Sequence, residues 1–195
     1  MGNLRDDFNQ TLNGEVWVTS NDGDGIVNAI GGRLLVTFGT MGANAGVATT
    51  QQWDLNSDAI SVEITAGGQA RVYFGVFDQF PDSSIYAGFT RLQTGELRFE
   101  VADIAGGIPE FSDLGTIDFN VIAHRFWRVR HDGTNIVYEV SAMGVDWEQV
   151  ATFQPVGSVR RMVVAMGAVG TAGDTAIAFD NVNGGGTSQP QMCPD

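Results

Sequence analysis

Apolar and polar side chains alternate along most of this chain. In residues 59–64, Ile60, Val62 and Ile64 are separated by small or polar residues, and residues 69–77 continue the same pattern. A period of two places successive side chains on opposite faces of a strand, so each such segment has one apolar face. The pattern therefore predicts β-strands, and no stretch shows the period of an amphipathic helix.

Short turns rich in glycine, asparagine and aspartate separate these strands. Residues 93–95 and 132–134 have the composition of hairpin turns, and Gly31 and Gly32 mark another turn. The segment 48–52 is rich in threonine, so we expect it to face solvent on one side. The predicted strands are, in chain order, 15–20, 33–38, 48–52, 59–64, 69–77, 84–91, 96–101, 125–131, 135–141, 147–153, 160–168 and 175–182.

A chain of about a dozen such strands has many apolar faces to bury. It must close into a barrel or stack two sheets face to face. The chain has 195 residues, of which 43% are hydrophobic and 17% charged, which is enough for one domain with its own core. The glycine-, serine- and proline-rich segment after Asn183 has the composition of a linker. We therefore expect one domain over 1–183 and a C-terminal arm over 184–195.

The charge distribution excludes several classes of partner. The net charge is −13, and all ten basic residues are arginines. Binding to nucleic acid or to an anionic membrane surface requires clustered cations, so we expect neither partner. No apolar run has the length of a membrane span, and the N-terminus shows no signal peptide. These features favour a protein that is made in the cytoplasm.

Four short strings in the chain resemble the concanavalin A-like lectin/glucanase superfamily, including its laminin G-like members. The third of these strings is the longest and extends over two predicted strands. The strings are Asp6-Asp7-Phe8, Gly31-Gly32-Arg33-Leu34-Leu35-Val36, Phe126-Trp127-Arg128-Val129-Arg130-His131-Asp132-Gly133 with its continuation to Trp147, and Ala178-Phe179-Asp180-Asn181-Val182. Their order and spacing match the superfamily over almost the whole chain.

The resemblance implies an all-β fold, a jelly-roll β-sandwich of two antiparallel sheets. It also implies that the first strand, near Asp7 and Phe8, lies beside the last strand, near Phe179 and Asp180. Trp127 and Trp147 are then expected to be structural, either filling the sandwich core or packing across strands.

The chain lacks the catalytic string of the glucanases that share this fold. Those enzymes are expected to carry two carboxylates on one strand, in a pattern similar to Glu-x-Asp-x-x-Glu. Here Glu63 stands alone on its strand, and Glu139 and Glu148 lie on separate strands. No serine, histidine and aspartate constellation is evident either. We therefore expect a protein that is not an enzyme. We also expect no cofactor, and the alternative is a bound Ca²⁺ ion.

The loop at residues 21–25 is the candidate calcium site. Asn21, Asp22 and Asp24 offer oxygen ligands with glycines between them. The closing glutamate of an EF-hand is missing, and Asp-Gly pairs are also ordinary turn residues. The sequence leaves a turn and a Ca²⁺ site as the two readings of this loop.

Three aromatic residues are candidates for stacking on a sugar ring. Trp53 follows the threonine-rich segment, Phe80 precedes Pro81 in a loop, and Tyr86 begins a predicted strand. The alternative for each of them is packing in the core or at a sheet edge.

The C-terminal arm is the candidate partner-binding segment, and it includes Gly184, Pro190, Met192 and Cys193. A segment of this composition has no core of its own and needs a surface to lie on. We expect that surface to belong to a neighbouring protein subunit, and the alternative is the arm's own domain. Cys193 is the single cysteine, so it is either a free thiol or a link between chains.

Two functions agree with these features. The first is a structural or accessory component of a virus particle, such as a bacteriophage tail or capsid-surface protein with a lectin-like domain. It would act as part of an oligomer or larger assembly and contact a host glycan. The alternative is a free carbohydrate-binding module or lectin. Fold by itself does not decide between them.

Overall fold

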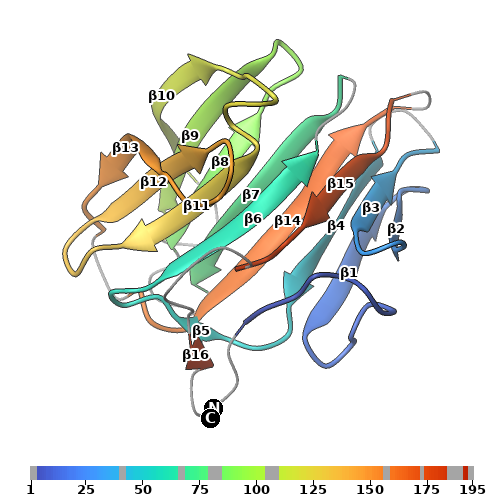
Figure 1. The fold of residues 1–195 in the computed structure, drawn as a ribbon, viewed down its shortest axis with the longest axis horizontal. Coiled ribbons are helices and arrows are strands. Elements are labelled where there is room, and N and C mark those ends of the chain that lie inside the picture. Colours follow the sequence, from blue (N-terminus) through green and yellow to red (C-terminus); the bar gives the residue numbers. More distant parts are fainter. Residues whose placement is uncertain are drawn as a thin grey trace.

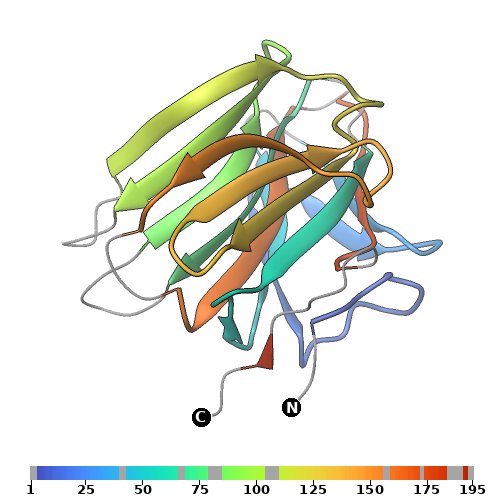
Figure 2. The same ribbon diagram turned by 60° about the vertical axis from the view of Figure 1, so that its left-hand side comes forward.

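The computed structural model describes residues 4–39, 43–65, 69–78, 85–103, 110–155, 159–171, 174–183 and 191–192. These residues form sixteen strands, all paired antiparallel, and contain no helix. None of the described segments is therefore a helix of the length and apolarity that a membrane span requires. The strands make two sheets that lie face to face (Figures 1 and 2).

Sheet 1 has nine strands and forms one layer of the sandwich. Its central path runs through seven strands, and two short strands attach beside it, β5 to β14 and β16 to β5. In spatial order the path is β1 (Trp17–Asp22), β4 (Ala43–Thr49), β14 (Met162–Gly170), β7 (Arg71–Asp78), β8 (Ile85–Arg91), β9 (Glu96–Asp103) and β10 (Glu110–Asp118), with β5 (Trp53–Asp54) and β16 (Gln191–Met192) beside it.

Sheet 2 has seven strands and forms the other layer. Its order is β13 (Glu148–Phe153), β12 (Ile136–Ser141), β11 (Phe126–His131), β6 (Ala59–Thr65), β15 (Ile177–Asp180), β3 (Leu34–Thr37) and β2 (Ile26–Ala29). The predicted fold class, an all-β sandwich of two antiparallel sheets, is confirmed.

An aromatic cluster between the sheets is the centre of the core. The rings of Phe89 and Trp127 stack with centroids 5.4 Å apart, and Phe99 packs edge-on against Phe89 at 5.7 Å. Tyr138 of sheet 2 packs on Phe89 and donates a hydrogen bond of 2.8 Å from its hydroxyl to the carbonyl oxygen of Glu100 in sheet 1. The two layers are thus joined by both apolar contact and a buried hydrogen bond.

The two ends of the domain lie side by side, as the resemblance implies. Asp6 and Val182 form an isolated antiparallel bridge. Asn183 is buried and strengthens this junction: its side chain accepts a hydrogen bond from the amide of Ser61 and donates one to the carbonyl of Leu4. The last residues of the domain therefore fasten its first residues to β6.

The predicted turns appear where the glycines stand. Gly31 and Gly32 connect β2 to β3 with φ values of +61° and +77°. Gly95 and Gly133 occupy the two predicted hairpin turns with φ values of +91° and +101°. L-residues with side chains rarely adopt these angles, so glycine is required at each turn.

The threonine-rich segment 48–52 is only partly a strand. Ala48 and Thr49 end β4, an inner strand between β1 and β14, whereas Thr50 and Gln51 follow it and are exposed, so the segment does face solvent in part. Alanine and glycine dominate β4, and small side chains let the neighbouring layers cover it. Trp147 is half-buried outside the sandwich core, where the Arg128 guanidinium lies 4.0 Å from its ring centroid.

The described end of the arm pairs with its own domain. Gln191 and Met192 form β16, in register with Asp54 and Trp53 of β5. This is the alternative placement for the arm, so contact with a neighbouring subunit is not needed to order these two residues. Gly184, Pro190 and Cys193 lie outside the described residues.

Removal of the central ring should destabilise the whole sandwich. We expect Phe89→Ala to lower the free energy of unfolding by about 3–5 kcal/mol, because it deletes contacts on three neighbouring rings and leaves a cavity. Urea unfolding followed by tryptophan fluorescence measures this change. Val145→Ala is the control, since Val145 is 62% exposed and should change stability by about 0.5 kcal/mol or less. Equal effects of the two substitutions would contradict this account of the core.

Candidate functional site

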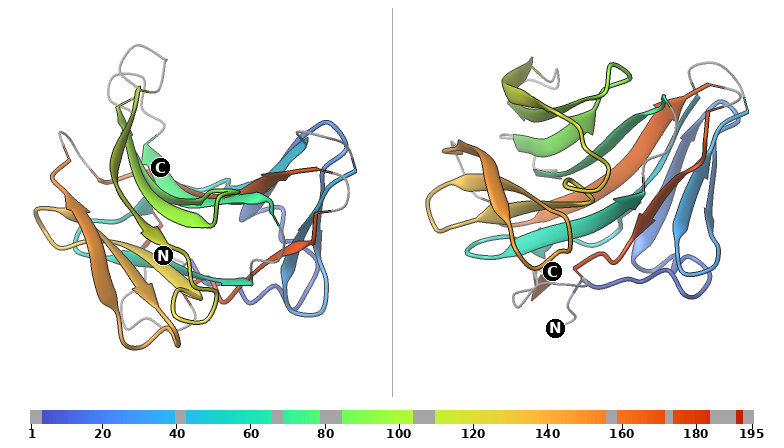
Figure 3. Two further views of the ribbon diagram at one scale, coloured as in Figure 1. Left: turned by 90° about the horizontal axis from the view of Figure 1, so that it is seen from above. Right: turned by 45° about the horizontal axis from the view of Figure 1, so that its top comes forward.

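The outer face of sheet 1 carries two tyrosines on a floor of glycines. Because the apolar residues of these strands point inward, the alternate positions line up in rows on the outer face. Figure 3 shows that this sheet is curved, with β8 to β10, drawn in green to yellow-green, rising out of the plane of β7 and β14. We call this surface the tyrosine face, and its floor consists of Gly46, Gly75, Gly88 and Gly167.

Tyr73 lies flat across two of these glycines. Its strand neighbour is Gly167, which in turn pairs with Gly46. A Cβ atom added to Gly46 would lie 2.7 Å from the Tyr73 hydroxyl, and one added to Gly167 would meet the same ring. The Tyr73 hydroxyl also donates a hydrogen bond of 3.1 Å to Asn44 Oδ1. Only residues without a side chain leave this space, so the glycines determine the position of the ring.

Tyr86 repeats the arrangement over the other two glycines. Gly75 and Gly88 are paired with each other. A Cβ atom added to Gly75 would lie 2.9 Å from a ring carbon of Tyr86, and one added to Gly88 would collide with its hydroxyl. These contacts place each ring over the sheet, and both tyrosines are partly exposed, so the rings keep access to solvent.

A buried carboxylate and two arginines border the tyrosines. Glu100 is 5% exposed and accepts a hydrogen bond of 2.6 Å from the Thr90 hydroxyl. Arg71 and Arg98 approach its other oxygen at 3.7 and 3.8 Å. These distances are longer than a hydrogen bond, so the charges compensate each other without a direct hydrogen bond to Glu100. Arg98 also lies 3.2 Å from Asp113 of β10.

Burial raises the pKa of all three tyrosines in the chain. The pKa of Tyr86 is raised first by burial and then by the negative charge of Glu100, against a smaller opposing effect of the Thr90 hydrogen bond. Burial also raises the pKa of Tyr73, partly offset by Arg71, and it raises the pKa of Tyr138 in the core. The hydroxyls on the tyrosine face are therefore neutral hydrogen-bonding groups rather than nucleophiles.

This arrangement is suited to holding a flat polar ligand. The face of an aromatic ring is electron-rich and attracts the weakly positive C–H groups of a sugar ring. The hydroxyls of Tyr73 and Tyr86 and the guanidinium groups of Arg71 and Arg98 surround the rings with hydrogen-bonding groups. A few placed polar groups around an apolar platform are typical of small-ligand sites.

The predicted sugar-stacking residues have different surroundings. Tyr86 is part of the tyrosine face. Trp53 on β5 is 4% exposed, so neither face of its ring is open to a ligand. Its indole nitrogen has no hydrogen-bond partner among the described residues. Its surroundings match the alternative of packing at the sheet. Phe80 lies outside the described residues.

The predicted calcium loop joins the two sheets. Asn21 and Asp22 are exposed at the end of β1, and Gly23 turns the chain toward β2 with a φ of +72°. Asp24 follows in the turn, and its carboxylate lies against Gly39. The described part of the chain holds no group of three or more acidic, histidine or cysteine side chains spaced for a metal ion. Calcium binding at this loop stays a prediction.

Sequence reasoning missed Tyr73 as a site residue. Its alternation within 69–77 is the same as that of any strand residue, so period alone does not single it out. The available signal is glycine inside strands, because Gly46, Gly75, Gly88 and Gly167 interrupt four strands at positions with no turn. Only strand pairing reveals that these four glycines share one face.

Solved structures similar to this chain are β-glucanases and their relatives. The catalytic domain of an endo-1,3-β-glucanase (laminarinase) from Thermotoga petrophila superposes with a TM-score of 0.64 at 8% identity, covering 98% of this chain and 97% of that one. A pseudo-β-1,3-glucanase and immunostimulatory antigen of Mycobacterium tuberculosis superposes with a TM-score of 0.67 at 13% identity over 98% of each chain. A Bacillus licheniformis β-glucanase gives 0.62 at 11%, covering 100% of this chain and 99% of that one.

These similarities establish the fold. No protein-family model and no curated protein sequence matches the chain. The chain has the concanavalin A-like jelly-roll fold, as its sequence resemblance implies, and identities of this size show the fold alone.

A side chain on the glycine floor should displace the ring above it. We expect Gly88→Ala to lower the free energy of unfolding by about 1–3 kcal/mol, because the added Cβ would collide with the Tyr86 hydroxyl and the backbone of Phe74. Urea unfolding measures the loss, and near-ultraviolet circular dichroism follows the tyrosines. Gly14→Ala is the control, since a Cβ there has no heavy atom within 4 Å. If the two variants were equally stable, the close approach of Tyr86 would be refuted.

The tyrosines should resist ionisation while the protein is folded. Free tyrosine has a pKa of about 10, and the folded-state pKa values are higher. The stability that the neutral tyrosines contribute is therefore complete below about pH 10 and is lost as the pH rises above it. Absorbance of tyrosinate during an alkaline titration should rise together with the loss of native circular dichroism. A full tyrosinate signal near pH 10 in the folded protein would contradict this expectation.

Proposed function

We propose that this chain is a carbohydrate-binding protein that holds a glycan on its tyrosine face without cleaving it. The observation that carries the proposal is the pair of tyrosine rings laid flat on the glycine floor. Glycines in the interior of strands weaken a sheet. Their presence under both rings is explained if the exposed platform has a use.

Solved structures of the same fold suggest which class of glycan to test first. The neighbours are described as β-1,3-glucanases and β-glucanases, and one is described as a pseudo-glucanase. β-Glucans are therefore the first ligands to test. Two rings on neighbouring strands, β7 and β8, suit a chain of sugars that crosses the sheet rather than a single sugar.

The carboxylates of this face support binding rather than hydrolysis. Glycosidases of the usual kind need two carboxyl groups flanking the scissile bond, about 5–5.5 Å apart in retaining enzymes. The outward positions described for β4, β14, β7 and β8 carry no carboxylate. Farther out on this face, Glu100 of β9 is buried and hydrogen-bonded to Thr90, and its strand partner Asp113 of β10 is held by Arg98 at 3.2 Å.

The structural role in a virus particle stays a sequence-based hypothesis. It depended on an arm that docks on a neighbouring subunit, and the described end of the arm pairs with β5 of the same chain. Binding of a host glycan to the tyrosine face is compatible both with a free carbohydrate-binding protein and with a component of a virus particle.

Loss of a ring should weaken glucan binding. We expect Tyr86→Ala and Tyr73→Ala each to reduce the affinity for a soluble β-1,3-glucan by about tenfold, because stacking contributes on the order of 1–1.5 kcal/mol. Isothermal titration calorimetry with β-1,3- and β-1,3-1,4-glucans measures the change.

Arg33→Gln on the opposite sheet is the control and should bind like the unmodified chain. Circular dichroism should confirm that each variant is folded. Unchanged affinity in both folded tyrosine variants would refute the assignment of the site. Release of reducing sugars by the unmodified chain would refute the non-catalytic part of the proposal.

A further inference from the structure

A second pocket lies on the opposite side of the molecule, at one end of sheet 2. It has a volume of about 360 Å³, and its walls come from four separate parts of the chain. They are the start of β3, the end of β6, the turn before β11 and the loop after β12. The lining residues are Arg33, Ile64, Thr65, Val121, Ile122, Arg125 and Ala142.

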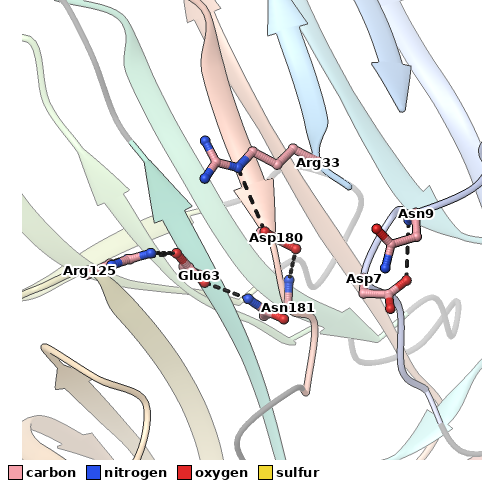
Figure 4. Close-up of polar contacts among 7 residues, drawn as sticks. All are labelled: Asp7, Asn9, Arg33, Glu63, Arg125, Asp180 and Asn181. Carbon is pink, nitrogen blue, oxygen red and sulfur yellow. Dashed lines mark hydrogen bonds and ion pairs between the residues drawn. The ribbon is translucent and has the colours of Figure 1, made fainter. Parts of the chain in front are cut away.

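Arg33 supplies one wall of this pocket, and its guanidinium makes no hydrogen bond to any of the described residues. Its side chain is 47% exposed and lies 3.8 Å from Asp180, which is an ion pair but longer than a hydrogen bond. Asp180 accepts a hydrogen bond of 2.7 Å from the Asn181 amide. Figure 4 shows the Arg33 side chain extending across β15 toward the side on which Arg125 lies. A guanidinium has five N–H donors, so Arg33 can bind an acceptor in the pocket.

Arg125 supplies a second cation, and it is fixed in place. Its Nε and one terminal nitrogen both donate to the same oxygen of Glu63, while the other oxygen of Glu63 accepts a hydrogen bond of 2.6 Å from Asn181 (Figure 4). Glu63 is 4% exposed, and both its oxygens have donors. Arg125 remains 48% exposed, lines the pocket, and has one terminal nitrogen that is not bonded to Glu63. The polar wall therefore has more donors than acceptors.

The wall of the pocket opposite the two arginines is apolar and exposed to solvent. Val121 is 49% exposed and Ile122 is 76% exposed, in the turn before β11. Phe126 and Ser141 are paired, so the loop after β12 adjoins this turn, and it carries Met143 at 75% exposure. Isolated exposed apolar residues are normal, but several large ones around a pocket mark a binding surface.

We propose that this pocket binds a peptide carboxylate that stands next to an aliphatic side chain. The two guanidinium groups would hold the carboxylate oxygens, since planar forked donors match that geometry. The aliphatic side chain would cover Val121 and Ile122. The site is independent of the tyrosine face, because its residues belong to sheet 2 and its turns. It would let the domain hold a protein segment on one side and a glycan on the other.

The test uses matched small probes on the isotope-labelled full chain. N-acetyl-leucine carries the carboxylate at a chain end, and acetyl-leucyl-aspartyl amide carries it on a side chain. N-acetyl-leucinamide lacks the charge. NMR titration of the backbone amides and arginine side chains follows each probe. We expect saturable shifts around Arg33, Arg125 and Ile122 with one or both acids, and which acid binds tells a chain terminus from an acidic side chain.

Two arginine variants provide a matched comparison. Arg33 and Arg160 are 47% and 67% exposed, and each makes an ion pair, of 3.8 and 3.9 Å, to a carboxylate that is itself partly exposed. Arg33→Gln should weaken carboxylate binding about tenfold, as loss of a charged partner does, and Arg160→Gln should leave it unchanged. Ile122→Ser should also weaken it. Arg125→Gln is avoided, because it would leave buried Glu63 without its cation.

Three results would overturn the proposal. They are the absence of saturable shifts with both acids, equal binding of N-acetyl-leucinamide, and an unchanged affinity in folded Arg33→Gln. Since none of these measurements uses a sugar, failure of the pocket and failure of glucan binding would be separate outcomes.

Discussion

The two sheets pack on each other through an aromatic cluster in which Phe89 of sheet 1 stacks on Trp127 of sheet 2. This packing determines which residues of each strand point inward. In a strand, a slip by one residue moves every side chain to the other face. With Phe74 and Phe89 held inward, Tyr73, Gly75, Tyr86 and Gly88 must point outward. The tyrosine face is therefore a consequence of the core. The hydrogen bond from Tyr138 to the backbone of Glu100 adds to this, because it fixes β9 against the opposite layer.

The outer faces of the two sheets use charge in the same way. Glu63, Glu100 and Glu139 are each at most 6% exposed, and arginines lie against each of them. In a chain of net charge −13, the scarce cations are thus placed over the buried carboxylates. Removal of such a cation would leave a buried charge without its partner, which is strongly destabilising. Arg71 and Arg98 border the tyrosine face, and Arg33 and Arg125 border the pocket on sheet 2, and all four stay partly exposed.

The fold and the proposed functions rest on different kinds of observation. The jelly roll is shared with β-glucanases at identities of 8–13%, which supports the architecture and a class of ligand to test. The binding proposals depend on particular side chains of this chain, the tyrosines over their glycines and the arginines of the second pocket. Either site could fail its test without changing the description of the fold.

The sequence by itself determined most of the strands, the hairpin turns and the all-β class, because period-two alternation and turn glycines are local signals. It did not predict β2 or β10, and it placed β4 several residues too late. It also indicated Tyr86 as a candidate ligand residue. It placed Trp53 among the stacking candidates and left Trp147 between the core and cross-strand packing, since local pattern does not tell which layer covers a given ring. Tyr73, its glycines and the Arg33 pocket came only from the tertiary structure. Their residues are far apart in the chain, and strand pairing, which depends on long-range packing, is what brings them together.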